Sequence, residues 1–365
     1  MATSMEEHAR WGGLRVPTGA VVSGTPIELD VGVATPRRVG AVAGGTSGAE
    51  AEPAWVLLLS GLGGQRIDWP EPLVEGLLTA GFGVIAPDNR DAGRSTVLPG
   101  PEVSLDALRA AVDAVAGEVV DGGPVVAPYP LAALADDAVA VLDHLGVGRA
   151  HVLGRSMGGM VAQHLAVRAP GRLRSLTLLA TTTGARDVGQ PTSAAAEALA
   201  APTPTGRDAV IAAGVARARV TASPDRFDEQ EVRRRLTARY DRAHDPAGTA
   251  RQLLAILADG DRTPLLERIT APTLVLHGDA DPLVTVSGGR ALGRAIPGAR
   301  LVEIPGLGHD LPAGLLERVT ALVVEHLRAV GGAEGPPPSR AAGAPPPRGA
   351  GPDDQPGWSP AAGVP

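Results

Sequence analysis

Hydrophobic positions along the chain alternate between short continuous runs and longer segments with apolar residues at helical spacing. The short runs cover Val56–Ser60, Val84–Ala86, His151–Gly154, Leu176–Ala180, Leu274–His277 and Leu301–Ile304. The helical segments include Pro72–Ala80, Leu131–Leu145, Met157–Arg168 and Ala313–Val330. Continuous apolar strands separated by helices are typical of a parallel sheet that is covered on both faces. The pattern therefore predicts an α/β protein with a mostly parallel sheet flanked by helices.

This alternation stops between residues 183 and 263, where the chain is rich in Ala and Arg and has few strand signals. We expect several helices there, forming a cap inserted between two strands of the sheet. The chain then divides into an N-terminal segment (1–20), a first part of the core (21–182), the cap (183–263) and a second part of the core (264–330). The last residues, 331–365, are dominated by Pro and Gly and are expected to be disordered.

Two further segments interrupt the core. Gly40–Pro53 is rich in Gly, Ala and Ser, which predicts a long hairpin loop. The segment Val97–Pro128 is expected to be a smaller helical insertion, because Leu105–Val120 is apolar at helical spacing.

Composition narrows the classes of function. The chain has 365 residues, 44% of them hydrophobic, which is enough for a sizeable core. Its net charge of −7 argues against nucleic acid as a partner, since a phosphate backbone needs a clustered basic surface. There is no cysteine, which excludes a thiol nucleophile and cysteine-bound metal. No secretory signal and no long uninterrupted apolar stretch is visible, so we expect a cytoplasmic protein without a membrane partner.

Ser156 is the candidate nucleophile. It lies in Gly154-Arg155-Ser156-Met157-Gly158, a G-x-S-x-G pattern. Because the chain has 48 glycines, this pattern arises easily by chance, and its flanks have to support the assignment. A predicted strand precedes it and a predicted helix follows at once, which is the context of a nucleophile elbow.

A serine hydroxyl needs a base, and the chain has eight histidines. His309 lies in a Gly-rich loop after the last predicted strand, at the sheet edge where the serine turn is expected. His164 lies about 12 Å further along the helix that follows Ser156 and is out of reach. His151 is expected to pack in the core, and His277 to support the turn after its strand. We therefore assign the base to His309.

The base needs a carboxylate, and the tetrahedral intermediate needs two N–H donors. Asp281, stiffened by the following proline, is the preferred carboxylate, and Asp279 is the alternative. The backbone N–H of Met157, directly after the nucleophile, is one expected donor. The N–H of Leu62, in the glycine loop after the first core strand, is the other.

The sequence argues against two other types of site, a dinucleotide site and a metal site. Gly61 and Gly63 after a strand suggest a dinucleotide site, but the third glycine of that motif falls at Arg66. His277, Asp279 and Asp281 offer metal ligands without a spaced histidine pair. We expect neither a cofactor nor a metal.

Taken together, the motifs SGLGGQRIDWP, APDNRDAGRS, GRSMGGM, HGDADPLV and GLGHDLP make the chain resemble the α/β-hydrolase superfamily from about Val21 to Val330. Their order matches the family order Ser, Asp, His. Within the superfamily the chain is similar to bacterial aclacinomycin methylesterase-like hydrolases. The resemblance implies hydrolysis of a small-molecule carboxylic ester, with a methyl ester on a polyketide as one candidate, by a monomer or homodimer.

Two positions depart from the family pattern. Ser60 stands where relatives often have His, and Asp91 stands where many have Gly. We expect Asp91 to form a salt bridge with Arg90 or Arg94. Thioester, lactone or carbon–carbon bond hydrolysis and cofactor-free perhydrolysis use the same triad and stay open, as does a ligand-binding module without catalysis.

Overall fold

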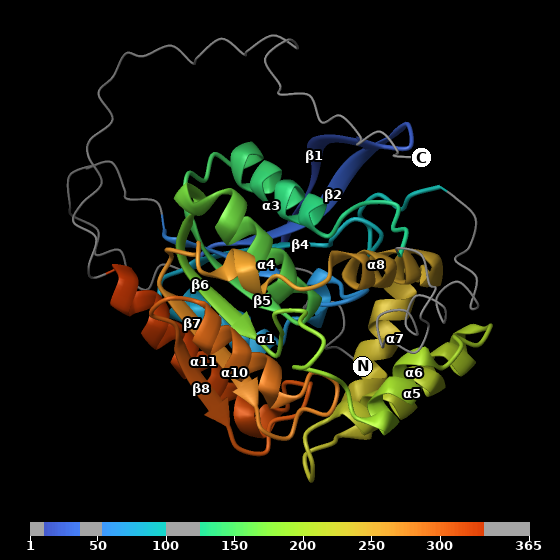
Figure 1. The fold of residues 1–365 in the computed structure, drawn as a ribbon. Helices are drawn as coiled ribbons and strands as arrows, with labels where there is room; N and C mark the ends of the chain where they lie inside the picture. Colours follow the sequence, from blue (N-terminus) through green and yellow to red (C-terminus); the bar gives the residue numbers. More distant parts are fainter. Residues whose placement is uncertain (1–10, 37–52, 100–124, 332–365) are drawn as a thin grey trace, which may run out of the picture.

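The structure is a computed structural model that describes residues 11–36, 53–99 and 125–331 (Figure 1). Three of the expectations above lie outside these residues. They are the loop over Gly40–Pro53 (except its last residue), the helix over Leu105–Val120, and the tail beyond Gly331.

An eight-stranded sheet forms the centre of the described protein, in the order β1-β2-β4-β3-β5-β6-β7-β8. Strands β3 to β8 are mutually parallel, and β1 and β2 are antiparallel to their neighbours. The six runs predicted as strands all lie in it, which confirms the mostly parallel sheet. The strands are β1 (Gly12–Val22), β2 (Thr25–Ala34), β3 (Trp55–Leu59), β4 (Gly83–Pro87), β5 (Ala150–Arg155), β6 (Leu173–Leu179), β7 (Thr273–Gly278) and β8 (Arg300–Ile304).

The β1–β2 hairpin corrects the sequence analysis, which placed residues 1–20 in an N-terminal segment. The sheet already begins at Gly12, and β1 pairs with β2 at both of its ends, with a register shift between Pro17 and Val21. Residues of β1 are mostly exposed or half-buried, so this edge strand lacks the continuous apolar run of the central strands. The hairpin turns at Ser23 and Gly24, both with positive φ, and such a two-residue turn was the signal available in the sequence.

Helices cover both faces of the sheet. On one face α1 (Glu71–Thr79) packs against α11 (Ala313–Gly331), and on the other α3 (Ala132–His144), α4 (Met157–Arg168) and α10 (Val286–Ala295) lie over the strands (Figure 1). Strand β3 shows why the central strands are apolar throughout. Its Leu57 and Leu59 pack towards α3 and α4, whereas Val56 and Leu58 pack towards α1 and α11. The remaining short helices are η1 (Arg66–Asp68), η2 (Pro170–Arg172) and α9 (Thr263–Leu266).

Four helices precede α9 between β6 and β7, in the segment where the sequence predicts a helical insertion. They are α5 (Ser193–Ala200), α6 (Arg207–Thr221), α7 (Glu229–Arg242) and α8 (Pro246–Asp259). Asp228 caps α7 by accepting the Glu231 N–H, and Asp245 caps α8 by accepting the Gly248 N–H. Figure 1 shows them, in yellow-green to orange, grouped beside the body that contains the sheet. Within the described residues, no helix has the length and apolar character needed to cross a bilayer.

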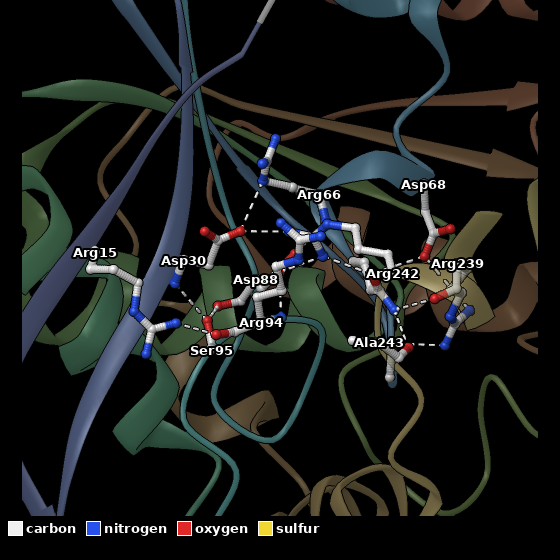
Figure 2. A network of polar contacts seen from close by, with 12 residues as sticks. Arg15, Asp30, Arg66, Asp68, Asp88, Arg94, Ser95, Arg239, Arg242 and Ala243 are labelled. Atoms are coloured by element: carbon white, nitrogen blue, oxygen red, sulfur yellow. Dashed lines mark hydrogen bonds and ion pairs between the residues drawn. The ribbon is translucent and has the colours of Figure 1, made fainter. Parts of the chain in front are cut away.

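A buried polar network joins α7 to the core (Figure 2). Arg242, at the end of α7, pairs with Asp30 on β2 and with Asp88 after β4, the latter at 2.6 Å. Arg66 closes the group, because its backbone N–H donates to Asp88 at 2.7 Å and its side chain pairs with Asp30 at 3.1 Å. The side chain of Arg242 is 2% exposed and that of Asp88 is fully buried. Two carboxylates of the core thus hold one guanidinium of the inserted helices.

The electrostatics of Asp88 depend on that guanidinium. Burial raises the pKa of Asp88 above its ordinary value, while Arg242 and the backbone N–H groups of Arg66 and Arg94 oppose the rise. A carboxylate in such a position is costly without its partner, because the interior solvates charge poorly.

The variant Arg242→Met tests this arrangement. It leaves Asp88 buried without its cation and Asp30 paired with Arg66 alone, so we expect the free energy of unfolding to fall by about 3–5 kcal/mol at neutral pH. Removing Arg242 raises the pKa of Asp88 further, so acid protonates Asp88 in the folded variant and removes its uncompensated charge. The loss should therefore be smaller near about pH 5 than near about pH 8, measured by urea unfolding.

Arg234→Met is the matched control. Arg234 lies on the same helix, but its side chain is 58% exposed where it pairs with Glu231, so the change should cost less than about 1 kcal/mol. Equal losses for the two variants, or a loss for Arg242→Met that does not vary with pH, would contradict the proposed role of the buried network.

Candidate active site

Ser156 occupies a strained turn between β5 and α4. Its backbone has φ 55° and ψ −124°, a conformation that costs a non-glycine residue about 1–3 kcal/mol. Tertiary contacts hold the turn in place. The Ser156 N–H donates to Leu179 O at 3.0 Å, and the Thr181 hydroxyl donates to Ser156 O at 2.8 Å. The turn therefore fixes Ser156 at the carboxyl end of β5.

The two motif glycines allow backbone segments to approach each other. A Cβ on Gly154 would lie 2.3 Å from Gly158 O, and one on Gly158 would lie 1.9 Å from Leu59 O. Neither distance leaves room for a side chain. The G-x-S-x-G pattern is thus required by the packing of α4 against β3 and β5, and is not an accident of a glycine-rich composition.

Three loops at the carboxyl edge of the sheet bring Ser156, Asp281 and His309 together. His309 Nδ1 lies 2.8 Å from Asp281 Oδ2, and His309 Nε2 lies 3.1 Å from Ser156 Oγ. A carboxylate can only accept, so Nδ1–H donates to Asp281 and leaves Nε2 free to accept from the serine hydroxyl. This is the geometry of a nucleophile, a base and a carboxylate that orients the base.

Asp281 is held as an anion. Burial alone would raise its pKa, but the charge and hydrogen bond of His309 and the Val284 N–H outweigh burial and hold the pKa below its ordinary value. Its second oxygen, Oδ1, accepts the N–H groups of Leu283 and Val284, each at 2.9 Å. Asp279, the alternative, is exposed and instead accepts the Gly306 N–H at 2.7 Å. The structure thus places the preferred aspartate, Asp281, against His309 and the alternative, Asp279, at a different turn.

The other central histidines have structural partners. His151 lies 2.8 Å from the Ser175 hydroxyl, and burial lowers the pKa of His151 to about 3. His277 Nε2 lies 2.7 Å from Val284 O, across the turn that carries Asp281. His164 pairs with a carboxylate at the end of α8. Each of the three stabilises the packing or a turn, and none of them contacts the Ser156 hydroxyl.

The glycine loop after β3 runs alongside the nucleophile. A Cβ on Gly61 would lie 3.2 Å from Ser156 Cβ and 3.7 Å from Ser156 Oγ. Leu62 follows directly, so its N–H belongs to the peptide that begins at Gly61. Met157 is the first residue of α4, where N–H groups have no partner within the helix and the helix dipole favours negative charge. Both expected donors therefore border Ser156.

Inserted residues hold the loop of His309. The Ser223 hydroxyl and N–H, between α6 and α7, donate to Asp310 Oδ1 at 2.5 and 2.8 Å, and the same hydroxyl accepts the Gly308 N–H at 2.8 Å. The His309 N–H donates to Thr221 O at 2.8 Å. Ser223 could not be predicted from the sequence, because no spacing connects a residue between inserted helices to the catalytic motifs.

Asp91 corrects a second expectation. It pairs with Arg251 of α8 at 2.8 Å and accepts the Tyr129 hydroxyl at 2.7 Å, while Arg90 pairs with Asp137. The expected salt bridge with Arg90 or Arg94 was therefore wrong, because the nearest opposite charges come from helices distant in sequence. Asp91 has φ 63°, the left-handed conformation that suits the glycine found in many relatives.

Comparisons with known proteins agree with this geometry. The alpha/beta hydrolase fold family matches residues 54–312. The chain is 30% identical to the rhodomycin D methylesterase DnrP of Streptomyces peucetius over 296 residues, which cover 75% of this chain and 91% of the relative. This likeness confirms the expected resemblance to aclacinomycin methylesterase-like hydrolases.

Solved structures show the same fold. A thermophilic esterase from Thermogutta terrifontis superimposes with a TM-score of 0.62 at 26% identity, covering 87% of this chain and 98% of the esterase. The enol-lactonase from Burkholderia xenovorans LB400 gives a TM-score of 0.59 at 25% identity, covering 85% and 99% of the two chains. The sheet order, the serine turn between β5 and α4, and the matched family span show that this chain belongs to the α/β-hydrolase family.

Proposed function

We propose that the chain is a serine hydrolase that cleaves a small-molecule carboxylic ester through an acyl-enzyme intermediate on Ser156. The observation that carries this proposal is the hydrogen-bonded series from Asp281 through His309 to Ser156 Oγ. Its two distances, 2.8 and 3.1 Å, are within the range that proton transfer between base and nucleophile requires.

In the first step, Ser156 Oγ attacks the ester carbonyl while His309 Nε2 takes its proton. Asp281 holds the Nδ1–H tautomer of His309 and stabilises the imidazolium that forms. The carbonyl oxygen becomes an oxyanion, which the N–H groups of Leu62 and Met157 stabilise. His309 then protonates the leaving alcohol, and Ser156 keeps the acyl group.

In the second step, His309 takes a proton from water, and the resulting hydroxide attacks the acyl carbonyl. A second oxyanion forms in the same place, and its collapse releases the acid and returns the proton to Ser156. Atoms and protons balance over the cycle: ester and water give acid and alcohol. The protein's own side chains and backbone supply every step.

Helices α5–α8 form the cap that selects the substrate in this proposal. Both aromatic side chains of the cap contact other cap residues: Phe227 lies under the Arg219 guanidinium, and Tyr240 stacks on His244. Small aliphatic side chains therefore supply most of its apolar surface, which suits a bulky apolar substrate. The likeness to a rhodomycin D methylesterase supports a methyl ester of a polyketide as the substrate class.

Ser156→Ala is the direct test of the nucleophile. Wild type and variant are compared on p-nitrophenyl esters from acetate to laurate. We expect kcat to fall by about 10⁴- to 10⁶-fold, because the remaining site can bind the ester but cannot form the acyl-enzyme. A fluorophosphonate probe should label wild type and not the variant.

Turnover by Ser156→Ala at the wild-type rate would sink the nucleophile assignment. If wild type labels with fluorophosphonate but hydrolyses no simple ester, the proposed ester class is wrong, and thioesters, lactones and diketones are the substrates to try. If wild type neither labels nor turns over, the chain is a binding module on a hydrolase scaffold.

A second prediction separates the two aspartates of the loop after β7. Asp281→Asn removes the acceptor that fixes the tautomer of His309, so kcat should fall by about 10⁴-fold. Asp279→Asn makes the same chemical change two residues away, where the side chain holds only a turn, and kcat should stay within about threefold. Equal losses in the two variants, measured with the same ester, would overturn the assignment of Asp281.

A further inference from the structure

The oxyanion loop, defined here as residues 60–66, is fixed to the core at its two ends. Asn89 Nδ2 donates to Ser60 O at 3.1 Å, and the Arg66 N–H donates to Asp88 Oδ1 at 2.7 Å. Both partners follow β4. The ends of the loop thus belong to the sheet, whereas its middle, which carries Leu62, faces the inserted helices.

Gly63, at the centre of the loop, is bonded to the inserted helices through both backbone groups. Its N–H donates to Gln252 Oε1 of α8 at 2.7 Å, and its carbonyl accepts from Arg239 of α7. Its φ is +57°, and a Cβ there would lie 2.7 Å from the Thr249 hydroxyl of α8. Helix α8 therefore packs directly on the loop beside Leu62.

The side chain of Gln252 has a single available orientation. It is fully buried, and while Oε1 accepts from Gly63, Nε2 donates to Arg90 O at 2.6 Å. Rotating the amide by half a turn would bring Nε2 against the Gly63 N–H, which is also a donor. It would bring Oε1 against Arg90 O, which is also an acceptor. Gln252 is thus a rigid bridge between the oxyanion loop and the turn after β4.

Two hydrogen bonds together determine where the Leu62 N–H points. Gly61 O, which shares a peptide plane with the Leu62 N–H, accepts from the Gly64 N–H at 2.9 Å. The next peptide plane contains the Gly63 N–H, which Gln252 holds. With both planes fixed, the backbone of Leu62 cannot rotate without breaking a buried hydrogen bond, which costs about 1–3 kcal/mol.

We propose that Gln252 is a positioning residue for catalysis: it holds the oxyanion loop so that the Leu62 N–H points at the developing oxyanion. The inserted helices then complete the oxyanion hole in addition to covering the substrate. This inference rests on the proposed function, and it adds a residue that is 189 positions from the loop it supports.

Gln252→Met tests the bridge with a side chain of similar length and no hydrogen bonds. An oxyanion exists in the transition state and not in the bound ester, so the loss should fall on kcat and leave KM within about threefold. We expect kcat to fall by about 10- to 100-fold, less than the loss of a whole oxyanion donor. The inhibition constant of a trifluoromethyl ketone, whose adduct with Ser156 carries an oxyanion, should rise by a similar factor.

Two further substitutions at the same position change the hydrogen-bonding groups of the side chain or its length. Gln252→Glu keeps an oxygen for the Gly63 N–H but turns the Nε2 donor to Arg90 O into a buried carboxylate oxygen, so it should lose stability and kcat together. Gln252→Asn keeps the amide but withdraws it by one methylene, and should lose kcat as Gln252→Met does. The asparagine variant keeps the test open if the methionine variant does not fold.

Gln163→Met is the matched control. Gln163 is also a buried glutamine with both amide ends bonded, to Thr182 O at 3.1 Å and to Arg262 Nε at 3.0 Å, away from the oxyanion loop. It should lower the melting temperature about as much as Gln252→Met and leave kcat and the ketone inhibition constant within about twofold.

The outcomes distinguish this inference from the function on which it rests. If wild type shows no ester turnover that depends on Ser156, the proposed function fails. If wild type turns over while both Gln252→Met and Gln252→Asn keep wild-type kcat and ketone inhibition, the function stands and the inference is overturned. Equal losses of kcat in Gln163→Met and Gln252→Met would also overturn it, since general destabilisation would then explain both.

Discussion

The close contact of three backbone segments at the serine turn is the constraint on which the rest of the site depends. Helix α4 approaches β3 and β5 so closely that neither Gly154 nor Gly158 has room for a Cβ. That approach holds Ser156 in its strained conformation and places the first N–H of α4 beside the hydroxyl. The strain is sustained by the surrounding sheet, whose fully buried strands cannot shift without losing packing on both faces.

Around this turn, the catalytic loops are supported by two different parts of the protein. The core provides the carboxyl ends of β3, β5, β7 and β8, from which the oxyanion loop, Ser156, Asp281 and His309 extend. The inserted helices hold two of these loops from the other side, through Gln252 at Gly63 and Ser223 at Asp310. The buried pairing of Arg242 with Asp30 and Asp88 keeps those helices in place. A change in the inserted segment can therefore reach the chemistry without touching the triad.

In the proposed function, the triad and the oxyanion donors come from the edge of the sheet, while the inserted helices cover the substrate. The insertion then offers the substrate mostly small aliphatic side chains, since Phe227 contacts the Arg219 guanidinium and Tyr240 stacks on His244. In this proposal, the helices that support the loops are also the helices that select the substrate.

The sequence by itself determined the parallel sheet, the inserted helices, and Ser156, His309 and Asp281 as candidates, because hydrophobic period and local motifs act over a few residues. The exposed β1–β2 hairpin lacked that signal. Only the tertiary structure placed Asp279 away from His309, paired Asp91 with Arg251, and brought Gln252 to Gly63. These pairings join segments far apart in the chain, and their geometry is set by how buried helices and strands pack together, which no local pattern of residues encodes.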